Sequence, residues 1–174
     1  MKKKIGIILL LAISVFLIIG CNNTKETKKE EKKETKKQTT VKKSETTKDK
    51  YIKSVQELRK VKESTEDLPF TVEVKYEKMD DEVRYQVIID NPSNKITDIT
   101  ALAIHDKQTD DVFPSVGIFD EKVNLIPDET PSGVILVGYI PYEGEIEDFT
   151  CEVKVLISYK MEEKTHKAYY LTKK

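Results

Sequence analysis

The side chains with the widest chemistry in this 174-residue chain are two cysteines, two histidines and 31 carboxylates. Thiols, imidazoles and carboxylates are the groups that bind metals, attack substrates and transfer protons. Each of these reactions needs several such groups at set spacings, so the spacing decides whether a site exists.

The histidines and acidic residues do not show the spacing of a known metal site. His105 and His166 have no cysteine or histidine at a metal-ligand spacing, so we expect no metal. We expect His105, near a strand end, to be a hydrogen-bonded edge residue. Asp106, Asp110 and Asp111 lack the alternation of a calcium loop.

Catalytic motifs are missing from the sequence as well. There is no G-x-S-x-G motif, and the glycines are too scattered to form a phosphate-binding loop. With 25 acidic residues between positions 51 and 174, close carboxylate pairs arise by chance and do not indicate a glycosidase. We therefore expect neither an enzyme nor a bound cofactor.

The first twenty residues have the basic head and short apolar run of a secretory signal. The run is shorter than the roughly 20 residues of a membrane span. It ends in Ile18-Ile19-Gly20-Cys21, which resembles the lipobox of bacterial lipoproteins. The resemblance implies a diacylglyceryl thioether on Cys21 and cleavage between Gly20 and Cys21. The alternatives are an uncleaved apolar anchor and an ordinary secretory signal in which Cys21 is incidental.

This resemblance leads to three expected segments. Residues 1–20 are a lipoprotein signal peptide, residues 21–50 are the lipidated cysteine with a disordered Lys/Glu/Thr-rich tether, and residues 51–174 are a folded domain. The tether contains Val41 as its single large apolar residue, too little to offset the entropy of ordering. Because two acyl chains anchor a protein stably, we expect it at the extracytoplasmic face of the cell membrane.

Charge differs sharply between the tether and the domain. Residues 22–50 carry 11 Lys against 6 acidic residues, whereas residues 51–174 carry 16 Lys and Arg against 25 Asp and Glu. An acidic domain argues against nucleic acid as a partner, because phosphate recognition requires a basic face. The tether could rest on anionic lipid or wall polymer, or it could be only a soluble spacer.

The domain sequence indicates an all-β fold, an immunoglobulin-like antiparallel β-sandwich of about seven strands, with turn residues every 8–12 positions. A short amphipathic helix is expected within residues 51–66, with Ser54 as its N-cap. The expected strands cover residues 70–78, 82–89, 99–105, 123–126, 133–140, 149–159 and 166–171.

Two positions in this pattern allow a more specific expectation. The uniformly apolar run at 133–140 predicts a central strand covered on both faces. Cys151 is in phase with the apolar side of the strand at 149–159, so we expect a buried thiol without a disulfide partner.

Residues 88–106 resemble small extracytoplasmic immunoglobulin-like modules of the FxLYD type. The resemblance comes from a strand that ends in IIDNP, a polar turn, and the apolar segment ITDITALAIHD. His105 stands where the family has an aromatic residue, and no glycine follows in the next turn. The resemblance implies an accessory or binding module and brings no catalytic residues with it.

Aromatic residues are the candidates for contact with a partner. In the irregular segment 106–120, Phe113 and Phe119 would be interface anchors if the segment is exposed. The alternative is that the segment folds back over the core. A second group could contact a ligand or simply occupy strand faces: Tyr139, Tyr142, Tyr169 and Tyr170.

Taken together, these features predict a membrane-anchored extracytoplasmic lipoprotein whose domain is a non-enzymatic binding or accessory module for a protein or envelope component. Two alternatives stay open: a hydrolase of envelope polymer that uses loop carboxylates, and a passive structural spacer.

Overall fold

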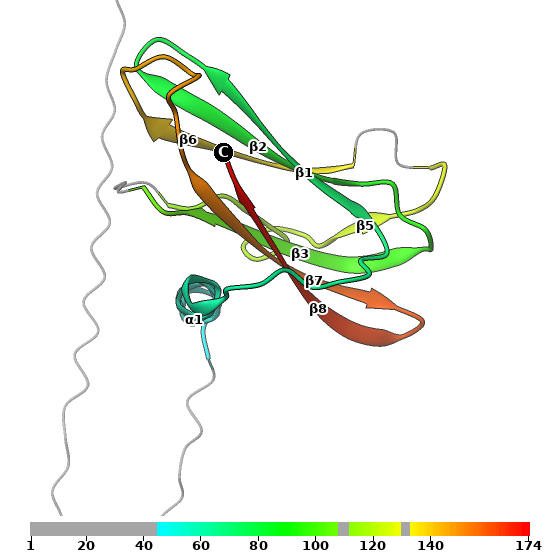
Figure 1. Cartoon of the computed structure of the whole chain (residues 1–174). Helices are drawn as coiled ribbons and strands as arrows, with labels where there is room; N and C mark the ends of the chain where they lie inside the picture. Colours follow the sequence, from blue (N-terminus) through cyan, green and yellow to red (C-terminus); the bar gives the residue numbers. More distant parts are fainter. Residues whose placement is uncertain (1–44, 108–111, 130–132) are drawn as a thin grey trace, which may run out of the picture. The chain divides into compact units, whose positions relative to one another are not determined.

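The computed structural model describes residues 45–107, 112–129 and 133–174. The predicted lipobox with Gly20 and Cys21, the tether up to residue 44, and Asp110 and Asp111 lie outside the described residues. The described part folds as one helix and eight strands (Figure 1). The elements are α1 (Thr47–Lys60), β1 (Thr71–Lys78), β2 (Glu82–Asp90), β3 (Ile96–His105), β4 (Ser115–Val116), β5 (Val123–Leu125), β6 (Val134–Pro141), β7 (Glu152–Met161) and β8 (Lys164–Lys173).

The strands form two antiparallel sheets that face each other. One sheet has the order β1-β2-β6, and the other has the order β4-β3-β7-β8, with β5 paired to β3. Strands β2 and β3 are consecutive in the chain but belong to different sheets, as in a Greek-key sandwich. The predicted all-β antiparallel sandwich is confirmed.

Period-two alternation builds the core between the sheets. Every second residue of β2 points inward and is fully buried, from Val83 to Ile89, and the same holds for Val153, Val155 and Ile157 of β7. Cys151 is also buried, as predicted, and this burial raises the pKa of its thiol to about 12. The thiol is therefore a core side chain rather than a nucleophile.

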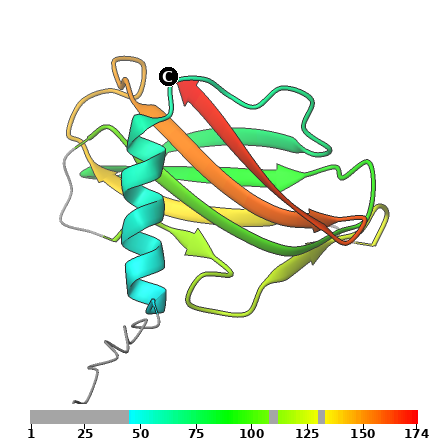
Figure 2. The same cartoon turned by 90° about the horizontal axis from the view of Figure 1, so that it is seen from below.

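Helix α1 covers the outer face of the second sheet (Figure 2). Its Leu58, with 0% of its surface exposed, packs against Leu102 and Ile104 of β3 and Leu156 of β7. This layer covers the apolar side chains on the outer faces of β3 and β7, which are Leu102, Ile104 and Leu156. The first sheet has no such layer within the described residues.

The predicted start of the helix is wrong. The helix begins at Thr47, within the segment expected to be tether, and its N-cap is Thr46 rather than Ser54. Thr46 and Asp49 form a capping box, in which each side chain accepts a hydrogen bond from the other residue's backbone N–H. The helix also ends at Lys60, earlier than expected.

The prediction of a doubly covered central strand at residues 133–140 is also wrong. Strand β6 lies at the edge of the three-stranded sheet, with β2 as its hydrogen-bonded neighbour. Its inward residues are buried, but Ile135, Val137 and Tyr139 are exposed to 42%, 38% and 44%. An apolar run therefore occurs here without protein covering its outer face.

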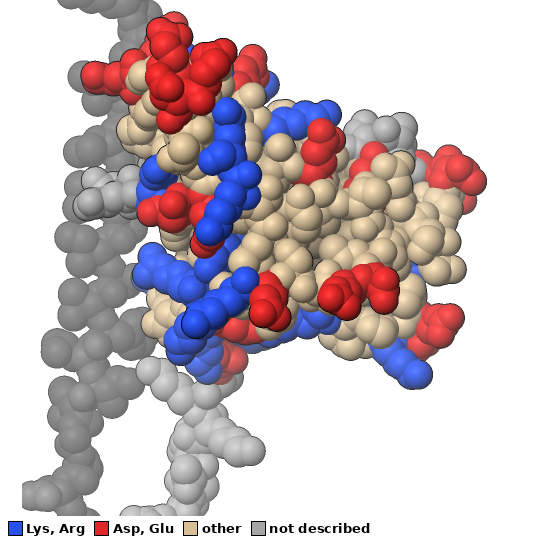
Figure 3. All heavy atoms as spheres, viewed as in Figure 1, with Lys and Arg blue, Asp and Glu red and all other residues tan. Residues whose placement is uncertain are grey.

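Charged side chains are unevenly distributed over the domain surface. Acidic side chains gather at the end of the sandwich that holds the β1–β2 turn and the β6–β7 loop (Figure 3). Basic side chains gather around α1 on the same face. On this face, the largest acidic group thus lies away from the helix.

We predict that Leu58→Ala lowers the free energy of unfolding by about 2–5 kcal/mol, because it leaves a cavity between α1 and the sheet. Ile52→Ala is the matched control, since Ile52 is on the same helix but exposed, and should change stability by less than about 0.5 kcal/mol. Urea denaturation followed by circular dichroism would measure both. Equal stability of the two variants would show that the helix does not depend on this contact.

Candidate functional site

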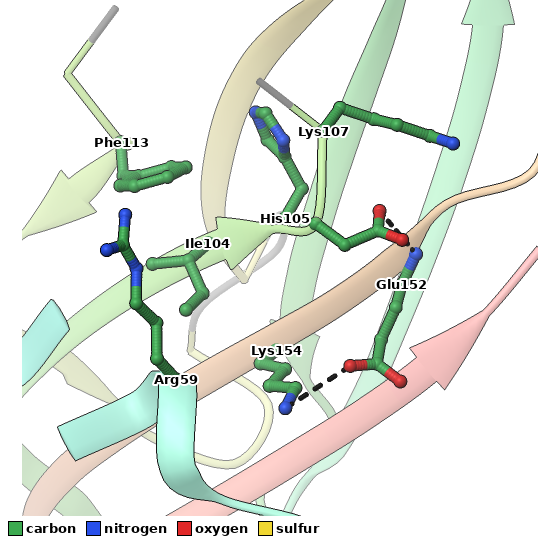
Figure 4. A pocket seen from close by; sticks show the side chains of 8 residues that line it. Arg59, Ile104, His105, Lys107, Phe113, Glu152 and Lys154 are labelled. Carbon is green, nitrogen blue, oxygen red and sulfur yellow. Dashed lines mark hydrogen bonds and ion pairs between the residues drawn. The ribbon is translucent and has the colours of Figure 1, made fainter. Parts of the chain in front are cut away.

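Two adjoining hollows lie where the end of β3 meets the C-terminal turn of α1. The polar hollow has a volume of about 490 Å³ and is lined by Arg59 of α1, residues 104–107, Phe113, and Glu152 and Lys154 of β7 (Figure 4). The apolar hollow has a volume of about 330 Å³ and lies between residues 112–114 and residues 137–139 of β6. His105 and Phe113 line both hollows.

The fold positions each wall of the polar hollow. Arg59 follows Leu58, so the burial of Leu58 fixes where the arginine side chain begins. His105 is the last residue of β3 and shares the inward phase of Ala101 and Ala103, which places it at the open end of the sandwich core.

His105 is a buried histidine with an unpartnered ring nitrogen. Only 8% of its surface is exposed, and its Nδ1 has no hydrogen-bond partner among the described residues. Its ring makes edge contacts with Tyr85 and Phe113, at centroid distances of 5.6 Å and 5.2 Å. The predicted edge position is therefore wrong, because the ring packs among aromatic side chains, although it still interacts with the Lys107 backbone.

Burial also determines the charge of His105. Desolvation lowers the pKa of its imidazole, and the Lys107 backbone and the Asp106 carboxylate offset only part of this effect. The ring is therefore held neutral at pH 7.

The two carboxylates of the polar hollow are already engaged by the protein. Asp106 accepts a hydrogen bond from the Glu152 backbone N–H at 3.0 Å. The Glu152 carboxylate pairs with Lys154 and Lys173, both at 3.2 Å, and these partners lower its pKa. Lys154 also donates to the Val61 carbonyl at 2.7 Å. Neither carboxylate is therefore placed as a free acid or base.

Arg59 differs from its charged neighbours. Its side chain forms no ion pair or hydrogen bond within the described residues, and its guanidinium points toward the Phe113 ring in Figure 4. Lys107 extends away from this pair. The hollow thus presents one unpaired guanidinium beside an aromatic ring and a neutral imidazole.

Backbone contacts fix the loop wall of the apolar hollow. The Ala103 N–H donates to the Pro114 carbonyl at 3.1 Å, and the Tyr51 hydroxyl donates to the Phe113 carbonyl at 3.3 Å. On the opposite wall, Gly138 lies over Tyr85, where a Cβ atom would come within 2.4 Å of the ring. These contacts hold the loop on one side of the hollow and strand β6 on the other, so the distance between the two walls is fixed by the fold.

The predicted contact residues are divided among several places. Phe113 is half-buried and lines the apolar hollow together with Tyr139. Phe119 is 58% exposed and lies beside Tyr51 of α1, with ring centroids 5.3 Å apart. The segment 106–120 thus folds back at Phe113 and projects at Phe119.

The predicted second aromatic group does not form. Tyr142 packs against Phe149 at a centroid distance of 5.0 Å, and the Tyr169 hydroxyl donates to Glu57 of α1. Tyr139 and Tyr169 belong to different sheets. Arg59 and Val137 were missed, although the uncharged stretch 131–142 was a signal for the latter.

The described residues contain no group of three or more His, Cys, Asp or Glu side chains that could hold a metal ion. No helix among them is long and apolar enough to cross a membrane.

The neutral His105 should make stability depend on pH. The unfolded histidine titrates near its usual pKa of about 6.5, whereas the folded pKa is lower, so the unfolded state binds more protons below that value. We therefore predict that the free energy of unfolding is highest above pH 6.5 and falls as the pH decreases toward 5. His105→Gln should lose this slope in urea denaturation between pH 5 and 7.5, and an unchanged slope would contradict the assignment.

Comparisons of the chain with protein-family models, with curated proteins and with solved structures found no match. The function is therefore inferred from the two hollows and from strand β6.

Proposed function

We propose that this protein is a lipid-anchored extracytoplasmic binding module that captures an extended segment of a partner protein along strand β6. The observation that supports this most is the exposed apolar edge strand. Within the described residues β6 pairs only with β2, and Ile135, Val137 and Tyr139 present apolar surface to solvent.

An unprotected edge strand is a template for another strand. Its outer backbone N–H and C=O groups are unpaired, and soluble proteins usually protect such edges with charged residues, proline or a covering loop. Residues 131–142, which include all of β6, contain no charged side chain, and the proline of β6, Pro141, stands at its last position and leaves the rest of the edge free. An extended peptide can complete the sheet at such an edge and gain main-chain hydrogen bonds.

The apolar hollow would give this strand addition its selectivity. In strand addition, main-chain bonds provide affinity and pockets for alternate side chains provide specificity. The hollow beside Val137 and Tyr139 has a volume of about 330 Å³, within the range of small-ligand pockets. It can accept one large apolar side chain of the bound segment, with Phe113 as its inner wall.

Charge favours a partner protein over a second copy of this chain. Residues 51–174 carry 9 more acidic than basic residues, so two copies repel each other at low ionic strength. The partner segment is therefore expected to be extended, to alternate apolar residues, and to lie in a protein that is less acidic.

The lipid anchor explains where this capture would occur. Cys21 follows an apolar run and a glycine in the order of a lipobox, and the domain begins at the capped helix α1. The hydrolase alternative has less support, because Asp106 and Glu152 are both held in bonds within the protein.

Lipidation at Cys21 can be tested in cells that express the chain with labelled palmitate. We expect the wild-type chain to incorporate label and to lose about 2 kDa, the mass of a signal of roughly 20 residues. Cys21→Ala should neither incorporate label nor lose this mass. Cys151→Ala is the matched control and should incorporate label and lose the mass like the wild type. Label on Cys21→Ala, measured by electrophoresis and autoradiography, would refute the anchor.

Capture along β6 can be tested by crosslinking in membranes followed by purification. We expect Val137→Lys to reduce recovery of specific partner proteins at least roughly tenfold, because a lysine on an edge strand opposes pairing. Glu73→Lys on β1 of the same sheet is the matched control, and its outward side chain lies at the other edge. Its recovery of the same proteins should equal that of the wild type.

Two outcomes would contradict capture by β6. One is unchanged recovery with Val137→Lys, provided that this variant unfolds within about 1 kcal/mol of the wild type. The other is a wild-type dimer that becomes monomeric with Val137→Lys in analytical ultracentrifugation, which would make a second copy the occupant of the edge.

A further inference from the structure

The polar hollow contains a positively charged side chain that is not paired with any acidic group of the described residues. Its two carboxylates are engaged, Asp106 with a backbone N–H and Glu152 with two lysines. The Arg59 guanidinium, by contrast, has no partner within the described residues and points into the hollow beside Phe113 (Figure 4). A planar guanidinium is suited to bind a carboxylate through two parallel hydrogen bonds.

A neutral ring lines the same hollow. His105 is more than nine-tenths buried, and its Nδ1 atom has no hydrogen-bond partner among the described residues. This nitrogen is itself buried, and the ring already interacts with the Lys107 backbone, so His105 forms a neutral floor of the hollow rather than a donor to an anion.

From the unpaired Arg59 and its apolar surroundings we infer that the polar hollow binds a carboxylate that carries an adjacent apolar group, with Arg59 on the carboxylate, Phe113 against the apolar group and the neutral His105 ring as the floor. Ile104 continues the apolar wall beside Phe113. The volume of about 490 Å³ accommodates a ligand of the size of an amino-acid derivative. This site does not depend on strand capture at β6.

The arrangement favours a carboxylate over a phosphate. A phosphate carries up to two negative charges, and Arg59 is the only cation of the hollow that points at the open space, since Lys154 is paired and Lys107 extends away. The engaged carboxylates of Asp106 and Glu152 would repel the second charge. One guanidinium beside a neutral imidazole matches a single negative charge.

The binding test uses the full-length chain in nonionic detergent and three small probes. N-acetyl-phenylalanine represents the end of a polypeptide, 3-phenylpropanoate represents a free carboxylic acid, and N-acetyl-phenylalaninamide is the uncharged control. We expect at least one acid to bind with a Kd on the order of 1 mM. The amide should bind at least tenfold more weakly. Shifts of the His105 ring signals in NMR spectra would locate the site.

Two variants assign the interaction to Arg59. Arg59→Gln should weaken binding of the acid about tenfold or more, as expected for loss of a charged hydrogen-bond partner. Lys60→Gln removes the same charge from the next exposed residue and should bind like the wild type. Both residues are on the helix surface, so both variants are expected to fold.

The outcomes separate the two sources of carboxylate. Tighter binding of N-acetyl-phenylalanine than of 3-phenylpropanoate would assign the site to a polypeptide terminus, and equal or weaker binding would assign it to a free acid. The inference is overturned if the amide binds as well as the acids, if Arg59→Gln binds like the wild type, or if the His105 signals do not move. Loss of β6 capture with intact acid binding would refute only the proposed function.

Discussion

The packing of Leu58 against the outer face of the second sheet is the contact on which the candidate site depends. Leu102, Ile104 and Leu156 place apolar surface on the outer faces of β3 and β7, and α1 covers it with Leu58. The same contact fixes the last turn of the helix above the end of β3. Arg59 is thereby brought beside His105, although the two are separated by 46 positions in the chain.

The outer face of the second sheet is covered by a helix, whereas the outer face of the first sheet is not covered within the described residues. The second sheet carries α1, whereas on the first sheet the outward side of β6 stays apolar and exposed. Exposed apolar surface raises the free energy of the unbound state, and this cost is recovered when a partner covers the surface. Within the described residues, the outer face of the first sheet is therefore the one that leaves a row of apolar side chains uncovered.

The strands could be predicted because alternation in sequence is a direct consequence of the pleat. The hairpin expected at residues 70–78 and 82–89 differs from β1 and β2 by one residue at each outer end. Strand β6 was placed correctly along the chain but assigned the wrong environment. An apolar run reads the same whether the chain's own layers cover it or it lies exposed at a sheet edge, so periodicity cannot decide between them.

The site was harder to predict than the fold for a related reason. Phe113 and Tyr139 were selected as contact residues by type, and the fold places both on the apolar hollow. Arg59 could not be selected from the sequence, because the sequence does not show which basic side chains form ion pairs. Only the structure shows that Arg59 has no partner within the described residues. His105 was expected to be satisfied, and only the packing of Tyr85 and Phe113 around it shows that Nδ1 is orphaned.

The residues of the two proposed binding sites are largely different from the residues that form the core of this domain. The core is closed by inward residues of β2, β3 and β7, while Arg59, Val137 and Tyr139 are exposed and contribute little to it. His105 and Phe113 are the exception, because they contact the core and also line both hollows. A ligand in either hollow would therefore press on the same two rings. His105 and Phe113 are thus the residues that the two proposed sites have in common.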